Sequence, residues 1–267
     1  KKHDQSLETT NWEVVSSDQS QVTFAYEAPD GSLRVEKVYR LTKADPNKQD
    51  MPAEFEQNAA GYTIEMELTI QNLGDEARSV EYELQGPIGV VLENKAHTRK
   101  YRDIKLEFLG EDDDVTLSAK EVVKLYESTL AEARSQGKNP TPKELRELVR
   151  QKEPWTGAIR YAGVDVQFFA ALMAPLDGRE EAARVSNKWI ARTYPILVVK
   201  NEANVNESDI SFRVASSPIE LQAKGEDDSV TRKHAFFVGP KRADLLDQPP
   251  MEAERVLDID TGFFNTI

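Results

Sequence analysis

Two histidines are the side chains in this sequence best suited to acid–base chemistry. His97 and His234 lie away from the amino terminus, and two histidines can transfer protons, as in sugar epimerases built on large β-sandwiches. Each would need a carboxylate partner on a neighbouring strand. Nothing in the spacing indicates one, because His97 lies in a polar, basic stretch and His234 directly precedes an expected strand. We therefore expect structural roles for both and predict no catalytic residues.

The acidic run Glu111–Asp114 does not have the spacing of a calcium site. A calcium loop that starts at Asp112 would need glycine at its sixth position, and that position is Leu117. The absence of cysteine excludes disulfides, thiolate catalysis and cysteine-based zinc sites. The sequence also lacks a glycine-rich phosphate loop and a Gly-x-Ser-x-Gly nucleophile motif. We predict no metal ion, no cofactor and no enzymatic activity.

Length and charge limit the class of protein. A chain of 267 residues with 39% hydrophobic residues can bury a sizeable core, as one large β domain or two smaller ones. Its net charge of -13 repels nucleic-acid backbones and anionic lipid surfaces, so no nucleic-acid partner is expected. No apolar run approaches the roughly 20 residues that span a bilayer. Both ends of the sequence look like cuts within a longer chain.

Alternating apolar residues predict antiparallel strands in the first hundred residues. A hairpin is expected around Asp30-Gly31, with apolar side chains on one face of its second strand and Lys37 as the exception. A second alternating pair follows, interrupted by a turn at Asn72–Asp75. Its apolar positions are Tyr62, Ile64, Met66, Leu68, Ile70, Val80, Tyr82 and Leu84. One-sided sheets of this kind usually pack against a second sheet.

Two capping boxes predict a helical hairpin inserted at residues 118–152. Ser118 with Glu121 starts the first helix, and Thr141 with Glu144 starts the second. Gly137 is placed to end the first helix. The hairpin could bind a partner or cover a sheet edge, and covering an edge is the commoner role.

Further strands and short helices are predicted after the hairpin. Strand patterns return within 155–175, 210–223 and 230–238, and Gly239-Pro240 ends the last of them. Short helices are expected within 243–246 and 251–257.

Three blocks in the second half of the chain carry a family resemblance. Trp155 and the block 167–175 are similar to a Trp…Tyr-Phe-Ala-Ala-x-x-x-Pro stretch, with Phe168 where Tyr is usual. Residues 237–241 resemble Tyr-x-Gly-Pro-Lys, and 257–264 resemble Leu-x-x-x-x-Asp-Tyr-Gly-Trp. These blocks resemble the large periplasmic domain of the YidC family of bacterial membrane-protein insertases. The motif residues given a structural role are Trp155, Phe168, Phe169, Pro175, Gly239, Pro240 and Lys241.

The resemblance implies a mainly β fold. It would be a large antiparallel β-supersandwich, similar to galactose mutarotase, over residues 1–242, with the helical hairpin at about 118–152. Residues 243–267 would form a helical segment that leads towards a membrane span.

The resemblance also implies a location and partners. The domain would lie on the periplasmic side of the bacterial inner membrane, in a membrane-embedded protein that inserts and folds nascent membrane proteins, alone or with the Sec translocon and its accessory subunits. The residues expected nearest the membrane or a partner are Leu257, Gly262, Phe263 and Phe264.

Two other functions stay open. The chain could be a carbohydrate-binding or carbohydrate-active β-sandwich, because a fold does not imply a function. It could also be an isolated extracytoplasmic sensor domain.

Overall fold

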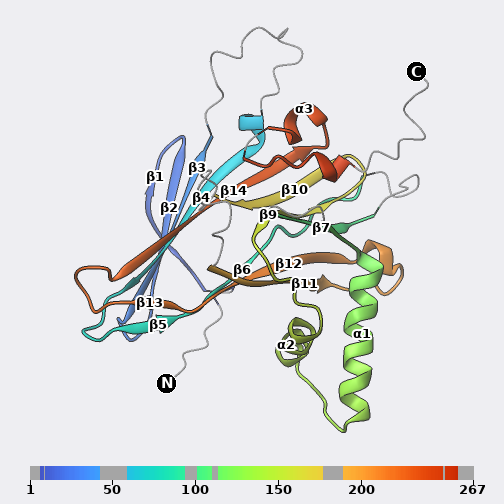
Figure 1. Cartoon of the computed structure of the whole chain (residues 1–267), viewed down its shortest axis with the longest axis horizontal. Helices are drawn as coiled ribbons and strands as arrows, with labels where there is room; N and C mark the ends of the chain where they lie inside the picture. The colour runs from blue at the N-terminus through green and yellow to red at the C-terminus, as the bar shows by residue number, and fades with distance from the viewer. Residues whose placement is uncertain are drawn as a thin grey trace, which may run out of the picture.

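A large antiparallel sheet dominates the computed structural model (Figure 1). The structure describes residues 7–8, 10–42, 59–93, 101–109, 114–176, 189–248 and 250–257. Within these ranges the large sheet has nine strands in the order β1-β2-β3-β4-β14-β10-β9-β7-β8. Their bounds, in sheet order, are Glu13–Ser17, Gln21–Glu27, Leu33–Leu41, Thr63–Asn72, Ser229–Pro240, Phe169–Pro175, Ile159–Asp165, Asp103–Phe108 and Asp114–Ser118.

A smaller sheet packs against one face of the large one. It contains β11 (Ile190–Val199), β12 (Asp209–Ser216) and β6 (Glu83–Gln85), and a separate pair joins β13 (Ile219–Leu221) to β5 (Arg78–Val80). We call the large-sheet face that meets the smaller sheet the inner face. The buried core between the sheets includes Ile104, Leu106, Ala162, Met173, Ile210, Phe212 and Val214.

The fold class expected from the sequence is confirmed. The described chain is mainly antiparallel β structure in two packed sheets, with a helical hairpin and short carboxyl-terminal helices. The alternation in 62–70 places Met66, Leu68 and Ile70 on the inner face of β4, where all three are buried.

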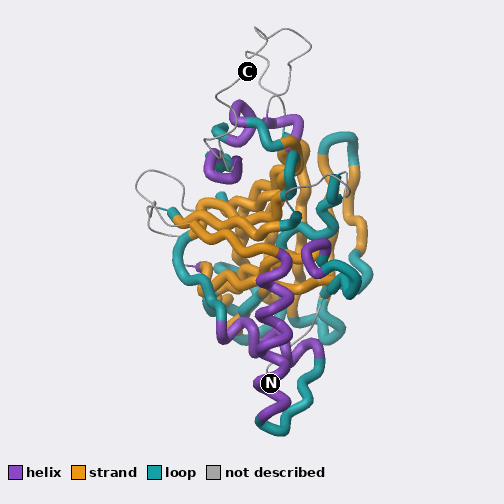
Figure 2. Tube along the Cα trace, turned by 90° about the vertical axis from the view of Figure 1, so that its right-hand side faces the viewer, coloured by secondary structure: helices purple, strands orange, loops and turns teal. Residues whose placement is uncertain are grey.

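The helical hairpin packs on the smaller sheet (Figures 1 and 2). It consists of α1 (Ala119–Ser135) and α2 (Pro142–Lys152), and both predicted capping boxes are present. Both helices contact β11, and α1 contributes Val122 and Tyr126 to the core between the sheets. The hairpin thus lies against β11, an edge strand of the smaller sheet, as expected for the commoner of its two possible roles. Two 3-10 helices complete this part of the description: Ala59–Tyr62 and Val205–Glu207.

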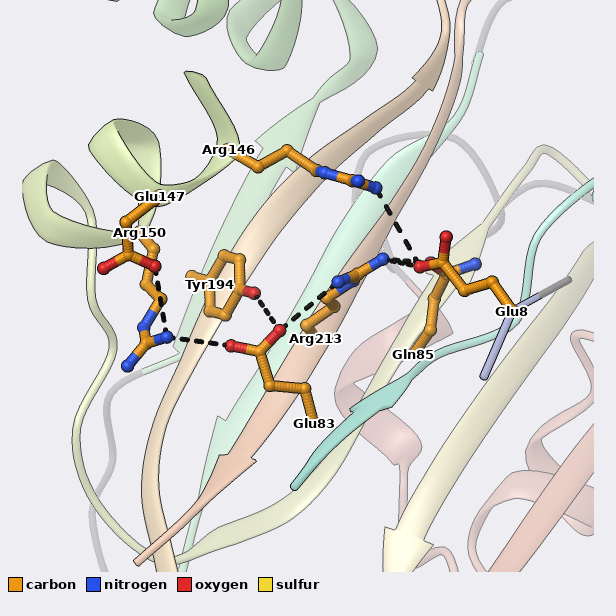
Figure 3. A network of polar contacts seen from close by, with 8 residues as sticks. All are labelled: Glu8, Glu83, Gln85, Arg146, Glu147, Arg150, Tyr194 and Arg213. Carbon is orange, nitrogen blue, oxygen red and sulfur yellow. Dashed lines mark hydrogen bonds and ion pairs between the residues drawn. The ribbon is translucent and has the colours of Figure 1, made fainter. Parts of the chain in front are cut away.

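A polar network holds α2 to the smaller sheet (Figure 3). Glu83 accepts hydrogen bonds from the Tyr194 hydroxyl at 2.8 Å, from Arg150 at 3.0 Å and from Arg213 at 3.3 Å. Arg213 also contacts Glu8. Burial, followed by the Glu83 carboxylate, raises the pKa of Tyr194 above its ordinary value. The network therefore joins the amino-terminal segment, α2 and three strands through charge-assisted hydrogen bonds.

Gly163 allows β9 and β10 to pack closely, so replacing it with alanine should destabilise the protein. A Cβ at this position would lie 2.6 Å from the Ala171 carbonyl oxygen. We expect Gly163→Ala to lower the free energy of unfolding by about 2 kcal/mol, measured by urea denaturation, because overpacking a core typically costs this much.

Gly61→Ala is the matched control. A Cβ at Gly61 would meet no atom within 4 Å, so its effect should stay within about 0.5 kcal/mol. Equal effects of the two substitutions would contradict the packing argument.

Candidate functional site

Two of the three motif blocks meet at one corner of the large sheet. β10 pairs with β14 so that Phe169 lies opposite Pro240 and Ala170 opposite Gly239. The backbone N–H of Lys241 donates to the Phe168 carbonyl at 2.7 Å. Segments about seventy residues apart in the sequence are therefore joined directly. We call this region, residues 165–170 and 237–241, the motif corner.

A buried ion pair fixes the motif corner. The Lys241 Nζ lies 2.7 Å from the Asp165 Oδ2 and donates to the Val166 carbonyl at 3.3 Å. The side chains are 6% and 0% exposed. A buried charge needs a close opposite charge, because leaving it alone in the interior is costly. The lysine that ends the Gly-Pro-Lys motif thus holds the end of β14 to the turn between β9 and β10.

Only glycine fits at position 239 of the motif corner, because two aromatic rings leave no room for a Cβ atom. A Cβ at this position would lie 2.7 Å from the Tyr62 ring and 2.9 Å from the Phe237 ring. The Tyr62 and Phe237 rings themselves contact each other, with centroids 6.1 Å apart. The motif glycine therefore lets two aromatic rings pack over β14.

The carboxyl-terminal segment packs on the outer face of the same strands (Figure 1). It contains α3 (Ala243–Leu246) and the 3-10 helix Glu254–Leu257. Arg160 of β9 pairs with Glu252 in this segment and with Glu107 of β7 at 3.0 Å. The buried residues of this outer cluster are Tyr161, Ala170, Leu172, Ala174, Ala235, Phe237, Leu245, Leu246, Met251, Ala253 and Val256.

The structure places the other predicted residues at different points. Trp155 forms an isolated antiparallel bridge with Thr193 and packs against the core between the sheets, away from the corner. Pro175 lies at the opposite end of β10, paired with His234. Leu257 is half-buried against the outer cluster. Gly262, Phe263 and Phe264 lie outside the described residues, as does His97.

The motif corner exposes a strip of apolar side chains. The alternation of apolar and polar residues along the strands did not predict this exposure. Phe168 is 57% exposed, Phe169 46% and Val238 59%. On the same inner face Leu41 pairs with Ile64, and both are also exposed. Strict alternation marks such positions as core, but the smaller sheet does not cover this end of the large sheet. Only the tertiary arrangement separates these residues from Met66 and Leu68.

His234 is buried between the sheets. It lies within β14, not before it as expected, and its ring is nearly perpendicular to that of Trp189, with centroids 5.6 Å apart. Burial, with the nearby Arg232 cation, lowers the pKa of His234 to about 4. A neutral, buried histidine fits the structural role predicted for it. In the described ranges no group of three or more His, Cys, Asp or Glu residues could hold a metal ion.

Comparison with solved structures finds proteins of the mutarotase type. A putative aldose 1-epimerase from Escherichia coli is 12% identical, with a TM-score of 0.40, over 85% of this chain and 68% of that one. A galactose mutarotase-like protein from Lactobacillus casei is 10% identical, with a TM-score of 0.44, over 85% and 73%. A Synechocystis protein is 9% identical, with a TM-score of 0.44, over 86% and 66%. At these values the likeness concerns the fold alone.

The comparison corrects one expectation. The prediction that the chain is not an enzyme is contradicted, because the neighbours in fold include proteins described as putative aldose 1-epimerases. The neighbours agree with the galactose-mutarotase-like β-sandwich expected for the fold. No protein-family model matches the sequence, and neither does any curated protein. Within the described residues, no helix combines the length and apolarity that a membrane crossing requires.

Breaking the Lys241–Asp165 pair should strongly destabilise the protein. Lys241→Met leaves the Asp165 carboxylate buried without its cation, and we expect a loss of about 3 kcal/mol or more in the free energy of unfolding, measured by urea denaturation. The double variant Lys241→Met with Asp165→Leu should recover part of that loss. Additive losses in the double variant would show that the two side chains do not act as a pair.

The titration of His234 predicts how stability depends on pH. Its folded pKa of about 4 lies below the ordinary 6.5, so the unfolded state binds the proton more readily between these values. The contribution of neutral His234 to the free energy of unfolding is fully present above about pH 6.5. As the pH falls towards 4 the protein loses up to about 3 kcal/mol of this stability, because the unfolded state takes up the proton first.

The matched variant is His234→Leu. Comparing its urea denaturation with that of the original chain at pH 7, 5.5 and 4.5 isolates the histidine. The variant should lose less stability on acidification, and parallel losses would contradict the assignment.

Proposed function

We propose that this chain is the large periplasmic domain of a YidC-type insertase, which aids the insertion and folding of inner-membrane proteins, alone or with the Sec translocon. The observation that carries the proposal is the motif corner. Residues singled out by their resemblance to that family, from two separate blocks, lie side by side and hold one another through Lys241.

The corner supports a mechanical role. The end of β14 is fixed by the Lys241–Asp165 pair, and the chain then passes directly into α3 and the 3-10 helix Glu254–Leu257, which pack on the same strands. Two points of attachment on a nine-stranded sheet make this a stiff connection. A membrane-embedded segment after Leu257 would then be held at a fixed position relative to the sheet.

The exposed strip supports a contact with a partner. Phe169 and Val238 lie on the paired strands β10 and β14, two positions out of register, and Phe168 directly precedes β10; all three expose large apolar side chains. Such groups mark interaction sites more often than they occur by chance on a protein surface. Accessory subunits of the Sec translocon and nascent membrane proteins are the partners that the proposal assigns to this strip.

A carbohydrate-binding or carbohydrate-active domain is the second candidate. It is favoured by the mutarotase-type proteins found among solved structures, which include putative aldose 1-epimerases. The two candidates differ in what they bind, and one experiment separates them.

Site-specific photo-crosslinking in membranes tests the insertase proposal. A photoreactive amino acid at Val238 of the full-length protein should crosslink to Sec subunits or nascent membrane proteins, because this side chain is exposed in the apolar strip. The matched control is Val199, which is 61% exposed at the end of β11, away from the strip. Enrichment at Val238 of at least about tenfold over Val199 is the expected result. Equal labelling at the two sites, or none at either, would contradict the proposal and favour the second candidate.

A further inference from the structure

Two arginines of the polar network in Figure 3 converge on one carboxylate oxygen. Arg213 of β12 contacts the Glu8 Oε1 through its Nη2, and the Arg146 Nη1 of α2 lies 3.9 Å from the same oxygen atom. Glu8 belongs to the amino-terminal segment, whereas the arginines lie on the smaller sheet and on the helix packed against it. Two cations from separate elements thus form a site that holds a carboxylate. We call Arg146 and Arg213 the arginine pair.

The Arg213 guanidinium is held in place by residues other than Glu8. Its Nη1 donates to the Glu83 carboxylate at 3.3 Å, and its Nη2 donates to the Gln85 side-chain oxygen at 3.2 Å. The Arg213 side chain is 13% exposed, so packing also restricts its orientation. A donor that is already ordered loses little conformational entropy when it binds a ligand. The site would therefore keep its geometry after Glu8 leaves it.

Glu8 is an accessible occupant of the site. Its side chain is 46% exposed, and that of Arg146 is 34% exposed. Ion pairs at the surface contribute little to stability, because water and salt screen them. The 3.9 Å between Arg146 and Glu8 is also longer than a hydrogen bond, so a carboxylate placed closer would bind this arginine better. Another carboxylate could therefore replace that of Glu8.

The segment that carries Glu8 links the two sheets. Glu8 contacts Arg213 on the smaller sheet, and Trp12, further along the same segment, packs on Tyr26 of β2 in the large sheet, with ring centroids 5.9 Å apart. Displacing Glu8 would remove its contact with the smaller sheet and leave the contact of Trp12 in place. A ligand at the arginine pair would therefore compete with this link between the sheets.

We propose that the arginine pair binds a carboxylate side chain on an acidic segment of a partner protein, and that Glu8 holds the site until the partner displaces it. The site already contains a carboxylate, that of Glu8, so the ligand chemistry is read from its present occupant. A protein suits the site better than a small molecule, because Arg146 and Glu8 lie at the open surface, where a small ligand would bury little area.

Local charge favours this exchange. Once Glu8 has left, the network in Figure 3 keeps three arginines and two glutamates, which are Arg146, Arg150, Arg213, Glu83 and Glu147. The excess of one positive charge attracts a carboxylate at contact distance. The chain's net charge of -13 opposes an acidic partner at longer range, where physiological salt screens the repulsion.

The proposal goes beyond the insertase function and does not depend on it. The arginine pair lies on the smaller sheet and its helical hairpin, whereas the exposed apolar strip lies on the large sheet. Binding is measured on this chain alone, and crosslinking at Val238 is measured on the full-length protein in membranes, so either can fail without the other.

Calorimetric titration of the Glu8→Gln chain tests the proposal, because this substitution keeps the size of the side chain and removes its charge. The probe is a short peptide of glutamate residues with blocked ends. It should bind Glu8→Gln with a Kd at or below about 1 mM. It should bind the original chain at least about fivefold more weakly, since Glu8 competes from an effective concentration in the millimolar range.

A second substitution locates the site. Adding Arg146→Gln to Glu8→Gln should weaken binding of the glutamate peptide about tenfold, because hydrogen bonds to charged groups are the strong ones. Arg146 is the arginine to replace, because its side chain is 34% exposed, whereas Arg213 is largely buried in the polar network. Its loss should therefore leave the fold intact.

Glu36→Gln is the matched control, because Glu36 pairs with one surface arginine, Arg34, at 3.4 Å. It should bind the glutamate peptide at least about tenfold more weakly than Glu8→Gln does, since one exposed arginine makes a weak site. A glutamine peptide of the same length should not bind. Glutarate, a free dicarboxylate, should bind at least about tenfold more weakly than the peptide.

Four results would overturn the proposal. No binding of the glutamate peptide to Glu8→Gln at about 10 mM, or equal binding of the glutamine peptide, would contradict a carboxylate site. Equal binding to Glu36→Gln or to the original chain would show that the site is not the one that Glu8 occupies. Equal binding of glutarate would contradict the choice of a protein partner.

Discussion

The pairing of β10 with β14 in the middle of the large sheet is the constraint on which the rest of the structure depends. Away from the motif corner these strands are covered on both faces, by the smaller sheet on one and by the carboxyl-terminal segment on the other. Burial on both faces removes much apolar surface from water, which stabilises this region. It also explains the small residues of β10, Ala170, Ala171 and Ala174, which let three layers approach closely.

The same pairing creates the motif corner. Once β10 and β14 are in register, Lys241 arrives next to Asp165, and the segment that follows must turn onto the outer face. A buried ion pair is a weak source of net stability, because both charges lose their hydration, but its loss on one side is costly. The Lys241–Asp165 pair therefore acts mainly on geometry, because it fixes the point at which the chain leaves the large sheet. That is the property that the insertase proposal uses.

The smaller sheet covers only part of the large one, and the exposed apolar strip follows from this. Strand β1 is exposed, and inner side chains of β2 and β3 such as Phe24 and Lys37 are half-buried, outside the core between the sheets. At the corner, the uncovered end of the sheet exposes the apolar strip around Phe168 and Val238.

The sequence by itself determined the local structure. Period-two alternation identified strands such as β2, β3, β4 and β12, although it missed β1, β7, β8 and β11, and Ser118 and Thr141 with their partner glutamates identified both helix starts. These signals are local, because the direction of a side chain and the capping of a helix depend on a few adjacent residues. What only the tertiary structure decided is which strands become neighbours and which faces are covered. Leu68 and Ile64 share one face and one pattern, yet only Leu68 is buried, because burial depends on a second sheet built from residues far away in the chain.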